Sequence, residues 1–321
     1  MLIFAGKSFR DMRKTLRVFT PIYILLVLAG MFAACDDTYN EKQMATRKQR
    51  AELRRLDSLA FKIGTTPTMD CLPVFIANEK GFFEKEGVDV RLRLRNSHLD
   101  LDTLLRGGWI EGAFTELVRA ERIVDNGVKL RYVAATNSYW QLVSNRNMRI
   151  RKLSQLSDKM VAMTRFSATD YLTTLAVDSA KPKNAVYRIQ INDVKIRLRM
   201  LYNNEIDAVW LTEPQLTAAK LYKNPVLMDS RKKNLNLGVL AVREKALADK
   251  NRSRQYAAFI KAYNAACDSI NKYGIASYAH VISKYMGADE KTIKALPKIT
   301  YTHAKAPREK DIEVARKAYK N

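Results

Sequence analysis

The chain has 321 residues, and its 56 Lys and Arg against 33 Asp and Glu give a formal net charge of +23. Three cysteines are too few for a disulfide scaffold. The motifs G-x-S-x-G, P-loop, H-E-x-x-H and C-x-x-C are absent, so we expect no catalytic residue, metal site or cofactor. Basic residues are spread along the chain rather than gathered in one stripe, which indicates that they lie on the solvated surface and argues against nucleic-acid binding. Attraction of an anionic ligand or surface stays open.

The N-terminus has the pattern of an export signal. Five basic residues precede a nearly uncharged apolar run over 18–34, which matches the n- and h-regions of a signal peptide. The run ends in Phe32-Ala33-Ala34-Cys35, which resembles the lipobox of bacterial lipoproteins, with Phe32 where Leu is usual. This resemblance implies cleavage after residue 34, a lipid on Cys35 and an extracytoplasmic, lipid-anchored protein. An uncleaved anchor helix is the alternative, and Met1 and Met12 both remain possible starts.

A polar, charge-dense stretch over 35–59 follows as a predicted tether between anchor and body. Leu53, Leu56 and Leu59 recur every three residues, so the second half of the stretch is expected to be a short helix.

Short apolar runs then alternate with helical patterns, the rhythm of sheets covered by helices. The predicted strands are 61–64, 88–92, 112–114, 130–134, 141–144, 160–163, 186–189, 208–211, 226–228 and 237–242. The predicted helices between them are 72–83, 99–105, 117–124, 169–178, 194–201 and 215–221. We expect these strands to form parallel sheets.

After residue 242 the pattern becomes helical. Tyr256, Phe259, Ile260, Tyr263 and Cys267 fall on one helix face, and further helices are predicted over 275–285, 290–296 and 308–319. Two α/β units followed by a returning strand and helices predict two lobes between which the chain crosses twice. The predicted division places 60–145 with 234–321 in lobe 1 and 146–233 in lobe 2.

Two motifs near the start of the body carry a family resemblance. Pro73 to Ala77 gives P-x-x-x-A, and Gly81, Phe83, Gly87 and Val90 give G-x-F-x-x-x-G-x-x-V. Together with 205–209 and the Glu213-Pro214 pair, they resemble type II periplasmic binding proteins of the nitrate, sulfonate, taurine and thiamine-pyrimidine-precursor (NMT1/THI5-like) branch. Asn204 stands where that family usually has Gly.

The resemblance implies an α/β, two-lobed Venus-flytrap fold with a helical C-terminal segment. It implies a monomeric binding protein that captures a small sulfonate-, nitrate- or aminopyrimidine-like ligand between its lobes and delivers it to an ABC transporter permease. A flytrap-type sensor, or less favourably an enzyme of the pyrimidine-synthase or menaquinone-pathway kind on the same fold, is the alternative.

Polar and aromatic side chains at predicted strand ends are the candidate ligand contacts, because open α/β sheets bind ligands there. The loop 66–70 offers polar groups that equally suit helix capping, and the hydroxyl-rich segment 165–171 suits an anion but equally suits capping by Ser167. Trp140 suits packing between lobes, and His98, His280 and His303 are expected on the surface or on helix faces. The predicted contacts are Thr66, Thr68, Asp70, Phe114, Thr115, Asn137, Tyr139, Arg165, Ser167, Thr169, Trp210 and Glu213.

The charge of the ligand stays open at this point. Arg165 and the helix start near Ser167 favour an anion, whereas Asp170 opposes one. Glu213, an acid before a proline at a strand end, would instead accept hydrogen bonds from an amine or amidine.

Overall fold

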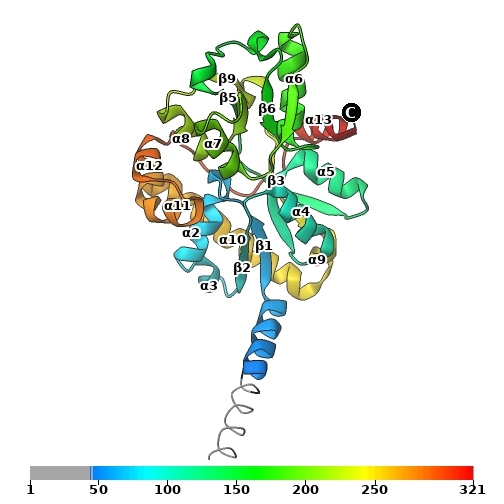
Figure 1. Cartoon of the computed structure of the whole chain (residues 1–321). Helices are drawn as coiled ribbons and strands as arrows, with labels where there is room; N and C mark the ends of the chain where they lie inside the picture. Colours follow the sequence, from blue (N-terminus) through cyan, green and yellow to red (C-terminus); the bar gives the residue numbers. More distant parts are fainter. Residues whose placement is uncertain (1–43, 45, 321) are drawn as a thin grey trace, which may run out of the picture. The chain divides into compact units, whose positions relative to one another are not determined.

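The computed structural model describes residues 44 and 46–320, so the predicted signal peptide and Cys35 lie outside the described residues. Residues 46–59 are helical, as the spacing of their leucines predicted. The α/β body begins at Ala60 and is a separate compact unit (Figure 1). Within the described part of the chain, no helix is long and apolar enough to cross a membrane.

The first sheet of the body has the strand order β2-β1-β3-β10-β4. β1 runs parallel to β2 and β3, whereas β10 runs antiparallel to both of its neighbours. The strands are β1 (Phe61–Thr65), β2 (Val90–Leu94), β3 (Gly112–Glu116), β4 (Leu130–Ala135) and β10 (Gly238–Arg243).

The second sheet has the order β7-β6-β8-β5-β9. β6 runs parallel to β7 and β8, whereas β5 runs antiparallel to β8 and β9. The strands are β5 (Gln141–Ser144), β6 (Met160–Met163), β7 (Tyr187–Gln190), β8 (Ala208–Leu211) and β9 (Val226–Asp229).

The expectation of parallel sheets is therefore wrong in one strand of each sheet. Parallel neighbours need a crossover connection, usually a helix. β5 and β10 are instead the strands that the chain enters directly from the other sheet, and both run antiparallel. Since β5 pairs within the second sheet, the predicted lobe boundary after residue 145 falls one strand too late.

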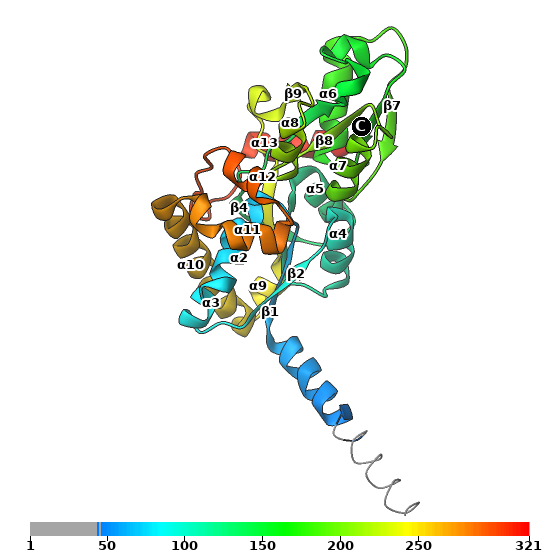
Figure 2. The ribbon, with the colours of Figure 1, turned by 60° about the vertical axis from the view of Figure 1, so that its left-hand side comes forward.

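Helices cover both sheets, and the tail beyond β10 is helical as predicted (Figures 1 and 2). Those following strands of the second sheet are α6 (Ala168–Ala180), α7 (Val194–Tyr202) and α8 (Gln215–Leu221). The others are α2 (Leu72–Glu79), α3 (Phe82–Lys85), α4 (His98–Gly107), α5 (Leu117–Asp125), α9 (Glu244–Ala248), α10 (Lys250–Tyr273), α11 (Ala279–Met286), α12 (Glu290–Ala295) and α13 (Glu309–Lys320). Short 3-10 turns occur at η1 (Met69–Cys71), η2 (Arg146–Met148), η3 (Leu153–Leu156), η4 (Ser230–Lys233) and η5 (Ile275–Tyr278).

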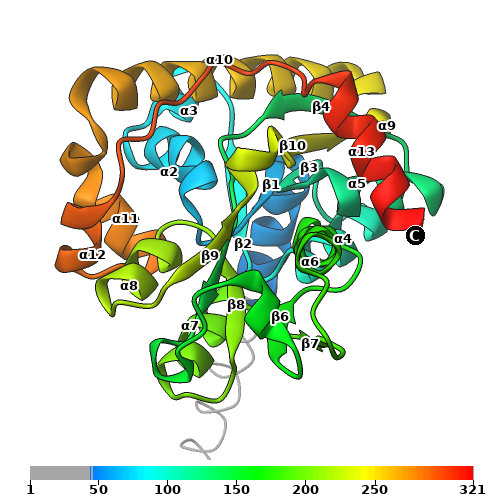
Figure 3. The same ribbon diagram turned by 90° about the horizontal axis from the view of Figure 1, so that it is seen from above.

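The main core lies between the first sheet and α2, α10 and α11. Phe259, Tyr263 and Cys267 are buried on one side of α10, which confirms the predicted apolar face. Cys71 and Cys267 are both buried and free. From above, α10 runs along one side of the body with the segment that leads to α13 beside it (Figure 3), and Asn264 and Asn271 of α10 hydrogen-bond the backbone of that segment.

Two chain segments connect the sheets, and they run side by side. The Thr136 N–H donates to the Gly238 carbonyl at 2.9 Å, and the Ser230 N–H donates to the Trp140 carbonyl at 2.9 Å. The Trp140 N–H in turn donates to Ser230 Oγ at 3.0 Å. The chain thus crosses between the sheets twice, as predicted, through one hydrogen-bonded pair of segments.

Candidate functional site

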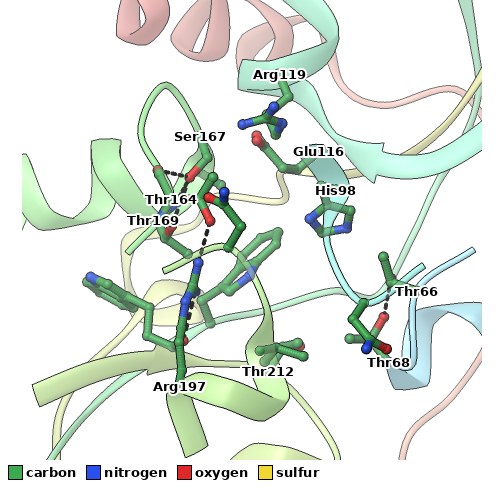
Figure 4. A pocket seen from close by; sticks show the side chains of 16 residues that line it. Thr66, Thr68, His98, Glu116, Arg119, Thr164, Ser167, Thr169, Arg197 and Thr212 are labelled. Atoms are coloured by element: carbon green, nitrogen blue, oxygen red, sulfur yellow. Dashed lines mark hydrogen bonds between the residues drawn. The ribbon is translucent and has the colours of Figure 1, made fainter. Parts of the chain in front are cut away.

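A small cavity of about 40 Å³ lies between the two sheets (Figure 4). Its polar wall is built at the carboxyl ends of strands, where open α/β sheets bind ligands. Thr66 follows β1, Glu116 ends β3, Thr164 follows β6 and Thr212 follows β8. Both sheets therefore contribute to one site.

Arg197 of α7 carries a buried positive charge on the cavity wall. Its side chain is 5% exposed and is held by the carbonyls of Ile191 and Trp210, at 2.6 and 3.1 Å, and by the Thr164 hydroxyl. Burial lowers its pKa to about 10, against a smaller opposing effect of Asp193 at the start of the same helix. Among the ion pairs of the described residues none involves Arg197. A buried charge without a carboxylate partner is costly unless a ligand compensates it.

Arg119 of α5 supplies a second buried guanidinium from the first lobe. It pairs with Asp102 of α4 and donates to the Arg165 carbonyl at 3.3 Å, across the gap between the lobes. Its Nε has no hydrogen-bond partner among residues 44 and 46–320. Burial raises the pKa of Asp102 despite the neighbouring Arg119. This arginine is thus neutralised by its partner and fixed in orientation, with one donor left over.

Glu116 caps the start of α5 and lines the cavity. Oε2 accepts the Val118 N–H at 2.8 Å, whereas the buried Oε1 has no partner in the described structure. Burial raises the pKa of Glu116 to about 8, and Arg119 only partly offsets this. The carboxyl group is therefore uncharged near neutral pH and can donate a hydrogen bond into the cavity.

His98, at the start of α4, faces the same space (Figure 4). Burial, together with the positive charges of Arg119 and Arg197, lowers its pKa to about 3. The side chain is half-buried at the start of a helix, which agrees with the expected helix-face position. The neutral imidazole has both a donor and an acceptor nitrogen to offer a ligand.

The hydroxyl-rich start of α6 forms the part of the cavity wall that the second lobe contributes. Ser167 Oγ accepts the N–H groups of Thr169 and Asp170, at 3.1 and 3.4 Å, and donates to the Thr164 carbonyl at 2.6 Å. Thr169 Oγ1 accepts the Thr164 N–H at 3.0 Å. Ser167 therefore caps α6 and lines the cavity at once, so the two interpretations of this residue are compatible.

A match to a family model over most of the body identifies the family of this chain. A family model described as NMT1/THI5 like matches residues 68–273, which is more than half of the chain. The chain belongs to the NMT1/THI5-like family. No curated protein matches this family member.

Solved structures share the fold of this NMT1/THI5-like protein at low sequence identity. A ligand-binding component of an ABC-type import system from Staphylococcus aureus matches with a TM-score of 0.68 at 15% identity, over 81% of this chain and 91% of that one. The aliphatic sulphonate binding protein SsuA from Escherichia coli gives 0.66 at 16%, over 81% and 85%. The nitrate-binding protein NrtA from Synechocystis gives 0.63 at 15%, over 73% and 68%. The fold is that of periplasmic binding proteins.

Five of the predicted contacts line the cavity of this family member: Thr66, Thr68, Ser167, Thr169 and Trp210. Thr66 and Thr68 share a hydrogen bond of 2.8 Å, and Trp210 is fully buried with its Nε1 donating to Thr173 at 2.8 Å. These residues are placed where a ligand would meet them, and their contact with a ligand stays a prediction.

The other seven lie outside the cavity wall. Asp70 accepts from Thr68 at 2.6 Å, and Phe114 and Thr115 are buried in the first sheet. The Tyr139 hydroxyl donates to Glu213 at 2.7 Å, and Asn137 donates to the Thr300 carbonyl at 3.4 Å. The Arg165 side chain is exposed, and only its carbonyl takes part, as the acceptor of Arg119.

Eight polar residues of the wall are not among the predicted contacts: Asn96, His98, Glu116, Arg119, Thr164, Asn192, Arg197 and Thr212. Arg197 did leave a signal, because Val194, Arg197 and Leu201 fall on one face of α7 and Arg197 and Leu201 are buried there. An arginine at an apolar-face position of a helix is the pattern that would have found it.

Proposed function

We propose that this protein is the solute-binding lipoprotein of an ABC transporter, which captures a small oxyanion between its lobes and passes it to a permease. The periplasmic-binding-protein fold supports this role, since the similar structures include components of ABC import systems and proteins that bind sulphonates and nitrate. The lipobox-like segment ending at Cys35 supports attachment by a lipid. We propose that the protein binds its ligand and catalyses no reaction on it.

Arg197 is the observation that carries the ligand class. Its guanidinium is buried on the cavity wall without a carboxylate partner among the described residues, and an anionic ligand would supply the missing charge. Neutral His98 and the unpartnered Oε1 of Glu116 add uncharged hydrogen-bond groups. Since Glu116 is a donor rather than an anion at neutral pH, it does not repel a sulfonate or nitrate.

The test is a thermal-shift screen against taurine, alkanesulfonates, nitrate, aminopyrimidines, thiamine and amino acids, on the protein and on Arg197→Gln. A ligand that binds only the folded state raises the melting temperature, by an amount set by RT ln(1 + [L]/Kd). We expect an oxyanion to stabilise the protein and Arg197→Gln to abolish the shift. Loss of one charge-assisted contact costs about 2–5 kcal/mol of binding free energy.

Arg199→Gln is the matched control, because Arg199 lies on the same helix but is exposed. Arg197→Lys keeps the charge and should retain weak binding. A shift produced by an aminopyrimidine and unchanged in Arg197→Gln would contradict the anion assignment while leaving the solute-binding role intact.

A further inference from the structure

The first sheet has a second edge, opposite the cavity, where β1 and β3 begin. The Glu111 N–H donates to the Lys62 carbonyl at 2.9 Å, the Arg243 N–H to the Glu111 carbonyl at 2.9 Å, and the Glu244 N–H to the Lys129 carbonyl at 3.0 Å. These bonds bring together the start of β1, the turn between α4 and β3, the start of β4 and the end of β10. We call this the basal edge.

Trp109 projects from the turn on the basal edge. It is 70% exposed, whereas Trp140 and Trp210, the other tryptophans of the chain, are 6% and 0% exposed. Its position is fixed by the backbone: the Trp109 N–H donates to the Leu104 carbonyl at 2.9 Å, and a Cβ at Gly107 would lie 2.6 Å from the indole ring. The exposed ring is thus part of a defined turn.

The charge around Trp109 is positive. Arg106, Lys129 and Lys245 are exposed, and the Arg243 guanidinium packs over Gly108, whose φ of +73° and missing Cβ give it room. Glu111 is buried and faces Lys62 and Arg252 at 3.8 and 3.6 Å. Glu244, Asp249 and Asp89, which precedes β2, are exposed acids near the same edge, and Asp89 pairs with Arg91 at 3.2 Å.

The body itself begins at this same edge, at Ala60. The Ala60 carbonyl accepts from Arg252 Nη1 at 2.6 Å, directly before β1. An exposed tryptophan among lysines and arginines is the composition that favours the headgroup region of an anionic bilayer. We propose that the basal edge rests on anionic phospholipid, with Trp109 at headgroup level and Arg106, Lys129 and Lys245 against the phosphates. The carboxyl-end edge, with the cavity, then points away from the bilayer.

The experiment uses the full chain reconstituted into vesicles that contain brominated phospholipid, a short-range quencher of tryptophan fluorescence. No tryptophan lies before residue 109, and the other two are buried, so quenching reports Trp109. We expect quenching in phosphatidylglycerol vesicles that salt reverses, and little in phosphatidylcholine vesicles. Trp109→Phe should remove it.

The variant R106E/K129E/K245E should lower the quenched fraction by roughly tenfold, because each basic residue near the surface adds to binding. The control K183E/K220E/K223E makes the same change in charge at exposed positions of the second lobe and should quench like the unaltered protein. Equal circular dichroism establishes that both variants are folded. Equal quenching in the two lipids, quenching that persists in Trp109→Phe, or equal loss in both triple variants would overturn the proposal.

Discussion

Glu116 is an acid and Arg197 is a base, and burial shifts the pKa of each in the direction that favours its uncharged form. For Arg197 the shift leaves the guanidinium charged, since its pKa of about 10 is still above neutral. For Glu116 the shift to about 8 changes the dominant form from carboxylate to carboxylic acid. The cavity therefore combines a fixed positive charge with a neutral donor, and the difference follows from where each pKa starts.

The raised pKa of Glu116 predicts a pH-dependent stability. Between pH 6.5 and 8 the unfolded carboxyl group is ionised while the folded one holds its proton, so the folded state binds more protons and the free energy of unfolding falls as pH rises. The slope approaches about 1.4 kcal/mol per pH unit. Urea unfolding of Glu116→Gln across this window should give a flatter profile than the unaltered protein.

His98→Asn is the control for that profile. The pKa of His98 is lowered to about 3, so its contribution to stability is present above its ordinary pKa of 6.5 and is lost as pH falls toward 3. Above pH 6.5 the His98→Asn slope should match that of the unaltered protein. Equal slopes for Glu116→Gln and the unaltered protein would show that Glu116 is ionised when folded.

The sequence predicts some residues of the site and hides others for a physical reason. Ser167 is predictable because capping is local: a hydroxyl just before a helix has its partners two and three residues away. Arg197 is not, because the Trp210 carbonyl and the Thr164 hydroxyl that hold it come from other strands. Its place on the apolar face of α7 distinguishes Arg197 from Lys195 and Arg199, but it does not show that the guanidinium lines a cavity.

At the scale of elements, local patterns locate helices and strands but leave their pairing undetermined. The apolar face of α10 was predicted because it depends on spacing within one helix. The directions of β5 and β10 were not, since no pattern within a single strand shows its direction and only the path of the chain between the sheets decides it. The lobe boundary was misplaced for the same reason.

α13 depends on contacts that no local pattern shows. Asp311 is 1% exposed, pairs with Arg308 at 2.6 Å and accepts the Asn236 N–H at 3.3 Å, from the segment that returns to β10. Arg316 of the same helix pairs with Glu121 of α5 at 2.9 Å. The last helix thus ties α5 to one of the two segments that connect the sheets.

Asp311→Ala should lower the free energy of unfolding by about 1–3 kcal/mol, because it removes the buried carboxylate that accepts hydrogen bonds from Asn236 and Arg308. Urea unfolding monitored by circular dichroism measures this. Lys310→Ala changes the exposed neighbour on the same helix and should stay within about 0.5 kcal/mol of the unaltered protein. Similar values for the two variants would show that α13 does not stabilise the body through Asp311.

At the scale of the whole body, the two lobes are bridged directly beside the cavity. The Met69 N–H donates to the Glu213 carbonyl at 3.0 Å, and Gln215 Nε2 donates to the Pro67 carbonyl at 3.0 Å. Arg119 adds its bond to the Arg165 carbonyl. Separation of the lobes would break such bonds, so they influence the balance between open and closed forms.

Gln215→Ala should shift the ligand-free protein toward the open form, because it removes one of these bonds. Small-angle X-ray scattering should show a larger radius of gyration, and hydrogen exchange at the Met69 N–H should be faster. Lys220→Ala, on the exposed end of the same helix, should change neither. An unchanged radius together with unchanged exchange would mean that Gln215 does not hold the lobes together.

The paired connecting segments have a consequence for how such a protein can diverge. Trp140 and Ser230 are hydrogen-bonded neighbours, so the stretch from β5 to β9 begins and ends at one place and is, in chain order, an insert between β4 and β10. An insert with adjacent ends can be exchanged as a cassette with little strain on its host. Such an exchange would replace the Arg197 half of the cavity while keeping Glu116 and Arg119, provided that Trp140 and Met228 still pack against Leu117 and Leu237. Recognition of a new ligand could then evolve in one half of the molecule while the other half, with its basal edge, stays unchanged.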